Sequence, residues 1–254
     1  MPVIAHVSDI HIDTDDGGHS VDRTRAVMTY LNDLPYDLDA VIVTGDVADH
    51  GTPAEYAAAR ELLASRHPLL VCPGNHDERA AFREHLLGEV PSAGPVNQSY
   101  VTDGFTLAVC DTSVPGEHHG RLDGETLDWL SALLTDTPPT RPALIAFHHP
   151  PVPLHTPYVD VIRQRDEHRL AELTARHPNV TAFLAGHAHT PAATTFANRP
   201  LLVAPGVVST LRLPWEHQEH EGHHVHRDLP PAAAFHVLDE ESRLTTHFRP
   251  VPLP

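Results

Sequence analysis

Five short segments rich in metal-binding side chains each follow an apolar run typical of a buried strand. The segments are residues 9–11, 45–49, 74–77, 148–149 and 186–189, and the runs before them are Val3–Val7, Ala40–Thr44, Leu69–Cys72, Ala143–Phe147 and Val180–Ala185. Continuous apolar runs of this length are typical of parallel strands that are buried on both faces. Ligands in such sheets bind beyond the carboxyl ends of the strands. We therefore expect an α/β fold in which the five segments converge at one edge.

The chemistry of these segments indicates a metal site. Their side chains supply carboxylate oxygen, amide oxygen and imidazole nitrogen, but no thiolate. Hard and borderline divalent cations bind to ligands of this kind. One Asp-x-His pair alone is more often a hydrogen-bonded loop end, but here the same context occurs five times. Gly45, Gly74 and Gly186, which begin three of the segments, either permit close approach of the backbone or are ordinary turn glycines.

In order and without a substitution, the segments resemble the D-x-H, G-D-x-x-D, G-N-H-[DE], H and G-H-x-H blocks of the calcineurin-like metallophosphoesterase superfamily. The match covers residues 4–189 and continues more loosely through residues 201–206. Within that superfamily the chain is most similar to the class III cyclic nucleotide phosphodiesterases. This narrower resemblance rests on the compact length, on Asp77 in the third block, and on the stretches 120–130 and 204–206.

Two departures separate the chain from other branches of the superfamily. His50 and Gly51 follow Asp49 where protein phosphatases have Arg-Gly, and His76 stands where lipid-pathway pyrophosphatases commonly have Arg. The resemblance implies a four-layered α/β/β/α sandwich, in which two mixed β-sheets are flanked by helices.

The resemblance also implies a binuclear metal centre. It assigns Asp9, His11 and His189 to one ion and Asn75, His148 and His187 to the other, with Asp46 bridging both. Two divalent ions can neutralise the charge of a phosphate ester, lower the pKa of a bridging water and orient it for in-line attack. Manganese or iron is favoured, while zinc or cobalt also suits these ligands.

Other residues in the same blocks are expected to serve catalysis. His76 resembles the family's non-ligand histidine, which stabilises charge beside the scissile ester or protonates the leaving oxygen. Asn75 and His76 are both expected to contact the substrate. Asp49 is expected to fix the tautomer of His76 and to raise its pKa, although a loop cap is the alternative. Asp77 is expected to orient a ligand or the loop backbone, and His149 either does the same or faces solvent.

The predicted function is therefore a binuclear metal-dependent phosphodiesterase that hydrolyses small phosphodiesters. Cyclic nucleotides, either 3′,5′-cAMP or 2′,3′-cyclic nucleotides, are the favoured substrates. The first alternative is a phosphomonoesterase or a broad phosphodiesterase with a non-cyclic physiological substrate, because two-metal sites serve both reactions. The second alternative is a non-catalytic scaffold, although degenerate relatives of that kind usually lose ligands or the catalytic histidine, and His76 is present here.

Size and composition limit the remaining classes. The 254 residues contain no linker-like segment and no repeat, so we expect one domain spanning residues 1–254. A formal net charge of −17 disfavours a nucleic-acid polymer as partner. The N-terminus lacks a signal peptide and no apolar run approaches the ~18 residues of a membrane span, so the protein is expected to be soluble and cytoplasmic. Cys72 and Cys110 lie in apolar runs and are expected to be buried and unpaired. A homodimer is left open.

The secondary structure expected elsewhere alternates between helices and short strands. Helices are predicted at residues 20–34, 53–66, 78–87, 123–134 and 166–176. A hairpin is predicted at residues 99–111, around Asp103-Gly104. From about residue 192 the chain is expected to form mostly short strands, at residues 192–196, 201–204, 207–211, 233–238 and 244–248.

A histidine-rich loop at residues 215–228 allows three interpretations. It contains His217, His220, His223, His224 and His226 in a chain that uses histidine 23 times. The three interpretations are a third metal site, a lid over the active site and a polar surface loop. The spacing matches no structural zinc pattern and no cysteine is nearby, so the surface loop is favoured.

Overall fold

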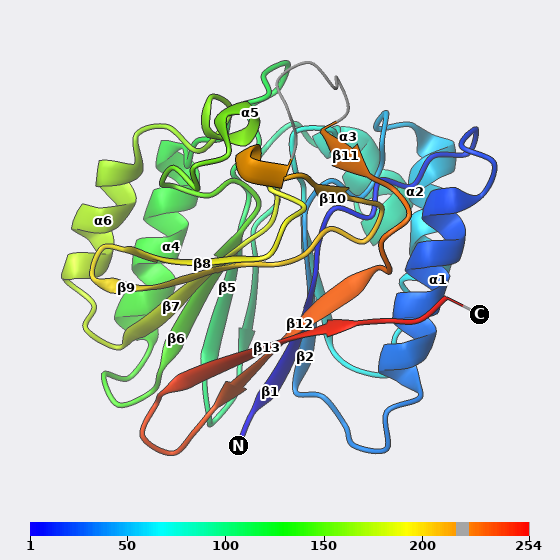
Figure 1. Cartoon of the computed structure of the whole chain (residues 1–254). Coiled ribbons are helices and arrows are strands. Elements are labelled where there is room, and N and C mark those ends of the chain that lie inside the picture. Colours follow the sequence, from blue (N-terminus) through cyan, green and yellow to red (C-terminus); the bar gives the residue numbers. More distant parts are fainter. Residues whose placement is uncertain (217–223, 254) are drawn as a thin grey trace.

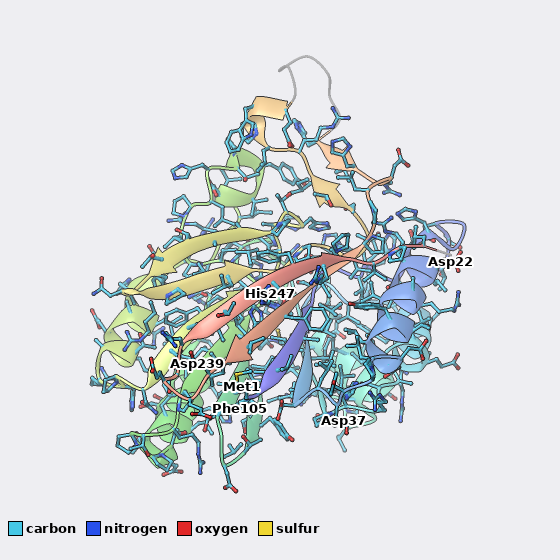
Figure 2. The ribbon with its side chains drawn as sticks, turned by 60° about the horizontal axis from the view of Figure 1, so that its bottom comes forward. Met1, Asp22, Asp37, Phe105, Asp239 and His247 are labelled. Carbon is cyan, nitrogen blue, oxygen red and sulfur yellow. The ribbon has the colours of Figure 1, made fainter. Side chains whose placement is uncertain are left out.

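Two β-sheets lie face to face in the computed structural model, which describes residues 1–216 and 224–253 (Figure 1). The first sheet has the strand order β13-β12-β1-β2-β3. Its parallel strands are β1 (Val3–Val7), β2 (Ala40–Thr44) and β3 (Leu69–Cys72). Its antiparallel strands are β12 (Ala232–Leu238) and β13 (Leu244–Pro250). Figure 2 shows β13, with His247 labelled, as the outer strand of this sheet.

The second sheet has the order β4-β5-β6-β7-β9-β8 and is also mixed. Its parallel centre consists of β5 (Thr106–Cys110), β6 (Ala143–Phe147), β7 (Val180–Ala185) and β9 (Arg199–Val203). The antiparallel edges are β4 (Gln98–Val101) and β8 (Ala192–Phe196). A separate ribbon of β10 (Thr210–Leu211) and β11 (Val225–His226) lies above the two sheets in Figure 1.

Helices cover the outer face of each sheet, which gives four layers (Figure 1). The first sheet is covered by α1 (His19–Asn32), α2 (Pro53–Leu62), α3 (Arg79–Ala81) and a π-helix, η1 (Phe82–Leu87). The second is covered by α4 (Gly124–Asp136) and α6 (Glu167–Ala175). Two short helices, α5 (Pro157–Asp160) and the 3₁₀ helix η2 (Pro214–Glu216), lie near the ribbon. The predicted α/β/β/α sandwich is confirmed.

The buried apolar side chains form three clusters, one between the sheets and one between each sheet and its helices. The alternation of side chains along the strands explains this division. In β1, Ala5 and Val7 pack toward the helices, whereas Ile4 packs between the sheets. The same division holds in the second sheet, where Ile145 faces α4 and α6 and Leu144 faces the first sheet. Because both faces of the central strands are buried, their sequences are continuously apolar rather than alternating.

Most of the predicted elements are confirmed, and the differences include the following. The segment 78–87 is helical but continues from α3 into a π-helix. The helix α5 was not predicted. The strand predicted at 207–211 is wrong over its first half, because the N–H groups of Val207 and Val208 donate to the carbonyls of Ser8 and Asp9 instead of pairing in a sheet. These two bonds tie the C-terminal segment to the end of β1.

Other predictions have a definite outcome. Cys72 and Cys110 are buried and free, as expected. Within residues 1–216 and 224–253, no helix is long and apolar enough to cross a membrane. Of the histidine-rich loop, His217, His220 and His223 lie outside the described residues. His226 belongs to β11, and the ring of His224 stacks with that of Tyr158.

Candidate metal centre

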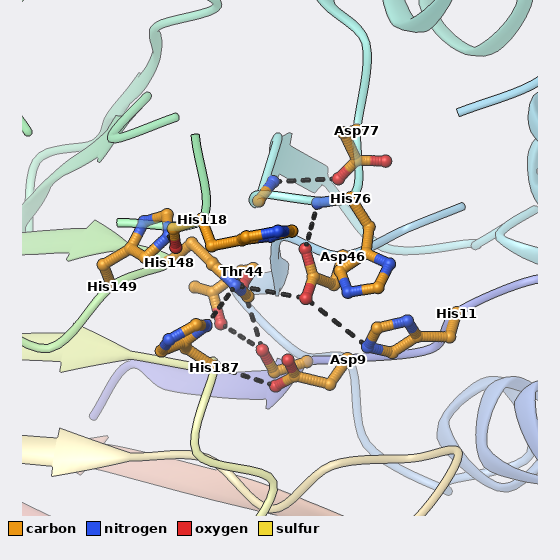
Figure 3. A network of polar contacts seen from close by, with 12 residues as sticks. Asp9, His11, Thr44, Asp46, His76, Asp77, His118, His148, His149 and His187 are labelled. Carbon is orange, nitrogen blue, oxygen red and sulfur yellow. Dashed lines mark hydrogen bonds and ion pairs between the residues drawn. The ribbon is translucent and has the colours of Figure 1, made fainter. Parts of the chain in front are cut away.

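The five ligand segments meet at the carboxyl ends of the strands of the two sheets (Figure 3). Hydrogen bonds of their backbones and side chains join them. The N–H of His11 donates to the carbonyl of Asp46 over 2.9 Å. The N–H of Gly186 donates to the carbonyl of His148 over 2.9 Å. Between the sheets, the N–H of His187 donates to Oδ2 of Asp9 over 3.0 Å. The segments therefore form one interlocked site rather than five neighbouring loops.

The predicted ligands form two adjoining groups around Asp46. In the first group, ligand atoms of Asp9, His11 and His189 all lie within 4.8 Å of one another. The second group brings His148 next to His187, with 3.1 Å between Nε2 of His148 and Nδ1 of His187. Oδ2 of Asp46 lies 3.4 Å from Nε2 of His11 and 3.4 Å from Nε2 of His148. The Asp46 carboxylate thus lies between the two groups, where a bridging ligand belongs.

Several buried polar atoms in these groups have no hydrogen-bond partner among the described residues. Buried polar atoms are almost always paired in folded proteins, so each exception needs an explanation. The unpaired atoms in the site are Oδ1 of Asp9, Nε2 of His11, Oδ1 of Asn75 and Nε2 of His187. All four can donate a lone pair to a cation, and all four belong to predicted ligands. The residues therefore fit divalent cations as their missing partners.

The backbone of the site is held in left-handed conformations that most side chains avoid. Each such residue costs about 1–3 kcal/mol, and such strain is concentrated at functional sites. Five of the predicted ligands show it, namely Asp9 (φ 53°), His11 (φ 40°), Asp46 (φ 49°), His187 (φ 69°) and His189 (φ 53°). The hydrogen bonds between the segments hold these residues in place.

Two glycines are required by close packing and not only by a turn. Gly45 has φ 84°, and a Cβ atom there would lie 2.5 Å from Nδ1 of His148. A Cβ atom on Gly74 would overlap the Oδ1 atom of Asp46. Of the two explanations open from the sequence, close approach of the backbone therefore holds at both positions.

A hydrogen bond at Nδ1 orients three of the predicted histidine ligands. Nδ1 of His148 lies 2.7 Å from the carbonyl oxygen of Thr44 and therefore donates to it. Nδ1 of His11 lies 2.8 Å from Oδ1 of Asp49, and Nδ1 of His189 lies 2.9 Å from Oγ of Ser209. Such partners fix the tautomer that leaves Nε2 available to a metal. Ser209 could not be predicted from the sequence, because nothing near it in the chain marks it.

The position of Asp49 corrects one expectation. Its carboxylate is 2.8 Å from Nδ1 of His11 but 3.7 Å from Nδ1 of His76. His76 instead donates from Nδ1 to the backbone carbonyl of Asp49 over 2.8 Å. The hydrogen bond from His11 holds the pKa of Asp49 below its ordinary value. Asp49 therefore orients His76 through its main chain and orients His11 through its side chain.

Asp77 orients the loop backbone, as expected. Its carboxylate accepts hydrogen bonds from the N–H groups of Val47, Ala48 and Gly74 and from the hydroxyl of Tyr56. Burial, together with the nearby Asp46 carboxylate, raises the pKa of Asp77 to about 6. Asp77 thereby holds the second ligand segment against the third.

His149 is buried, so the alternative that it faces solvent is wrong. Its Nδ1 lies 2.9 Å from Oγ1 of Thr112, and its Nε2 donates to the carbonyl of His118 over 3.2 Å. Burial and the neighbouring His187 hold the pKa of His149 well below its ordinary value. A neutral His149 therefore connects the β6 loop to the loop that carries His118.

Asp46 and His148 lie in contact at the middle of the site and shift each other's pKa. Burial alone would lower the pKa of His148, but the Asp46 carboxylate outweighs it and raises the pKa to about 9. Burial opposes the ionised form of Asp46, yet His148 holds the pKa of Asp46 well below its usual range. A bound cation would take over the role of the proton on His148.

A row of buried, hydrogen-bonded polar side chains, here called the polar file, extends from Thr44 into the space between the sheets. The carbonyl of Thr44 also accepts the hydrogen bond from His148. Oγ1 of Thr44 lies 2.7 Å from Nε2 of His6, and Nδ1 of His6 lies 3.0 Å from Nε2 of His236. Nδ1 of His236 lies 2.8 Å from Oγ1 of Thr246. The Thr44 hydroxyl donates to Ser8, so His6 donates to Thr44 and His236 donates to His6. Every side chain of the polar file has its hydrogen-bond partners when both histidines are neutral.

A cavity of about 510 Å³ opens over the two ligand groups. This volume lies within the ~300–1,000 Å³ that is usual for small-molecule sites. One wall is polar and contains predicted ligands, His76 and His118. Another part of the lining is mainly apolar and contains Tyr158, Val159, Val161, Ile162 and Leu211. The lining of the cavity thus combines ionisable and apolar side chains.

Two juxtaposed His/Asp clusters at the strand ends of a four-layered sandwich define a metallohydrolase site. A family model for the calcineurin-like phosphoesterases matches residues 2–191, and the chain belongs to this family. Its members use a dimetal centre, and the protein is accordingly a metal-dependent phosphoester hydrolase.

Similar proteins agree with this assignment. A glycerophosphodiester phosphodiesterase of Enterobacter lignolyticus is 35% identical over 92% of this chain and 86% of its own length. A cAMP/cGMP dual specificity phosphodiesterase of Mycobacterium tuberculosis is 36% identical over 82% of this chain and 68% of its own length. A dimetal phosphatase from Danio rerio has a similar fold, with a TM-score of 0.71 at 15% identity over 99% of this chain and 96% of that one.

Proposed function

We propose that the protein is a phosphodiesterase of small phosphodiesters and that cyclic nucleotides are its preferred substrates. The proposal rests on one observation. Around the Asp46 carboxylate, Asp9, His11, Asn75 and His187 each have a buried atom that can bind a cation and has no hydrogen-bond partner among the described residues. Asp9, His11 and His189 would hold one cation and Asn75, His148 and His187 the other, with Asp46 shared. A non-catalytic scaffold is disfavoured, because every predicted ligand and His76 are present.

When bound, two divalent cations would neutralise the phosphate charge and lower the pKa of the attacking water. The chain's own residues position the substrate and move the proton. His76 lines the cavity, and its hydrogen bond to the carbonyl of Asp49 leaves Nε2 for the substrate. Protonated His76 would donate from Nε2 to the leaving oxygen as the P–O bond breaks. The N–H of His76 donates to Oδ1 of Asp46 over 3.0 Å, which keeps this residue beside the shared ligand.

The relatives support two substrate classes. One is named for cyclic nucleotides and another for glycerophosphodiesters, and both are more than 30% identical to this chain. The apolar wall of the cavity favours a substrate with an apolar, planar part over a polyol, because few groups on that wall form hydrogen bonds. Glycerophosphodiesters are therefore the second candidate.

A substrate panel tests the proposal. The metal-depleted protein is reconstituted separately with manganese, iron and zinc, and turnover is measured for 3′,5′-cAMP, 2′,3′-cAMP, glycerophosphocholine and 5′-AMP. We expect at least one reconstituted form to hydrolyse a cyclic nucleotide faster than the other substrates. Asp46→Ala should abolish this turnover. Faster hydrolysis of 5′-AMP, or activity that persists after metal removal, would overturn the proposal.

A further inference from the structure

A second pocket adjoins the metal cavity and shares part of its wall. Its volume is about 250 Å³. Tyr158 and Leu211 line both spaces, so a molecule with its phosphate at the metal centre can extend into the second pocket without leaving the protein surface. The other lining residues are Thr156, Pro157, Arg212, Pro214 and His224.

The dominant feature of this pocket is an aromatic surface. The Tyr158 side chain remains exposed, with 64% of its surface accessible, although its ring stacks with that of His224. The two ring centroids are 6.3 Å apart and the planes differ by 18°. Tyr158 is thus accessible to a further planar group.

The ring is presented by a short but anchored element. On α5, Val159 is buried in the apolar cluster between the second sheet and α4 and α6, and its N–H donates to the carbonyl of Thr156 over 2.9 Å. The carboxylate of Asp160 accepts from the N–H of Leu154 over 2.7 Å. The facing wall is held by a 2.8 Å backbone bond from Arg212 to His224. Both walls of the pocket are therefore fixed by the fold.

The chemistry of the lining selects among candidate occupants. Most of the surface that lines this pocket is apolar, which disfavours a glycerol group. Aromatic rings also attract a quaternary ammonium such as choline, but the lining includes Arg212, a cationic residue, which disfavours a second cation. A heteroaromatic base, which stacks on tyrosine and tolerates a neighbouring guanidinium, satisfies both conditions.

We propose that this pocket is a subsite for the nucleobase of a nucleotide whose phosphate lies at the metal centre, with Tyr158 as the stacking residue. The inference rests on the proposed function and names the part of the substrate that the second pocket recognises. Tyr158 thereby determines specificity for nucleotides over phosphodiesters without a base, and takes no part in bond cleavage.

A binding cycle tests the subsite without measuring turnover. The Kd values of AMP and ribose 5-phosphate, which differ only by the base, are measured by calorimetry for the wild type, Tyr158→Phe and Tyr158→Ala. Stacking of a base on an aromatic side chain is worth about 1–3 kcal/mol, so AMP should bind roughly 5- to 150-fold more tightly than ribose 5-phosphate to the wild type. Tyr158→Phe should keep most of this ratio, and Tyr158→Ala should reduce it toward one.

The matched control is Tyr36→Ala, which removes a tyrosine that is 83% exposed and lines neither pocket. It should leave the ratio unchanged. Unchanged binding of ribose 5-phosphate to Tyr158→Ala shows that this variant is folded. A wild-type ratio near one, or a ratio that survives Tyr158→Ala, overturns the subsite. Failure of the wild type to hydrolyse any phosphodiester would overturn the proposed function instead, and it is measured independently of the ratio.

Discussion

The histidines of the site are oriented by three chemically different partners. His148 donates to a backbone carbonyl, His189 lies against the hydroxyl of Ser209, and His11 lies against the carboxylate of Asp49. Only the last of these places a formal negative charge behind the ring, which makes the imidazole a stronger donor to a cation. We therefore propose that the Asp49 side chain supports metal binding through His11.

Replacing Asp49 by Asn should weaken metal binding. Loss of the charge behind His11 is expected to reduce the affinity of one cation by roughly 10–100-fold, as measured by competition with a chelating dye. Asp13→Asn is the control, because the Asp13 carboxylate accepts a hydrogen bond from the Asp15 backbone and from no predicted ligand. If Asp49→Asn binds metal normally but turns over slowly, the carboxylate acts on His76, as the sequence had indicated.

Replacing His76 by Ala should separate catalysis from metal binding. His76 lines the cavity without belonging to either ligand group around Asp46, so both cations should remain bound in stoichiometric analysis. Turnover of ordinary esters should fall by roughly 10²–10⁴-fold, and turnover of a nitrophenyl ester should fall less, because its leaving group needs little protonation. His50→Ala, at an exposed position outside the cavity, should have no such effect. Loss of a cation from His76→Ala would identify His76 as a ligand.

At the scale of elements, one buried ion pair joins the two halves of the site. Nε of Arg79, on α3, lies 2.8 Å from Oδ2 of Asp111, which follows β5 in the other sheet. Arg79 also donates to the carbonyl of Ser113 over 2.8 Å. The element after the His76 segment is thereby fixed to the loop that leads to His118.

Arg79→Met should destabilise the fold by about 3–5 kcal/mol, because it leaves the Asp111 carboxylate buried without a counter-charge. Urea unfolding at neutral pH measures this loss, and Asp111→Asn in the same chain should restore part of it. The control is Arg25→Met, since Arg25 and Asp22 form an exposed pair whose loss should cost under about 1 kcal/mol. Equal effects of the two arginine substitutions would contradict a structural role for the Arg79 pair.

At the scale of the whole molecule, the polar file between the sheets makes stability depend on pH. Burial lowers the pKa of His236 to about 3, and burial with the neighbouring His236 holds the pKa of His6 well below its ordinary value. The unfolded chain takes up protons on these groups near pH 6.5, before the folded chain does. The stability that comes from keeping these two histidines neutral is therefore fully present above pH 6.5. It is lost progressively as the pH falls toward 3.

The loss from His236 should be about 1.4 kcal/mol for each pH unit below 6.5. Urea unfolding of the metal-free protein at pH 7 and pH 4.5 should therefore show a decrease of roughly 3 kcal/mol from this group. His236→Gln keeps an amide to bond with His6 and should reduce the decrease by that amount. His247→Gln, on the exposed edge strand, is the control. An equal decrease in wild type and His236→Gln would show that His236 is already charged in the fold.

The sequence by itself determined the chemistry of the site and the main elements that carry it. Apolar runs and ligand residue types are local properties, so the strands before residues 9, 46, 75, 148 and 187 and the helices α1, α2, α4 and α6 were predictable. The family resemblance added the arrangement of the sheets and helices in four layers. Asp77 could be assigned to its loop because it lies in the same block as Asn75.

Only the tertiary structure decided how distant groups pair. Ser209 reaches His189, and Thr44 holds both His148 and His6, because strand order brings together segments that are far apart in the chain. The left-handed backbone conformations of the predicted ligands could not be foreseen. Their strain is maintained by hydrogen bonds between loops rather than by local preference. Nothing in the sequence marks Tyr158, and its proposed role depends on how α5 meets the β10–β11 ribbon.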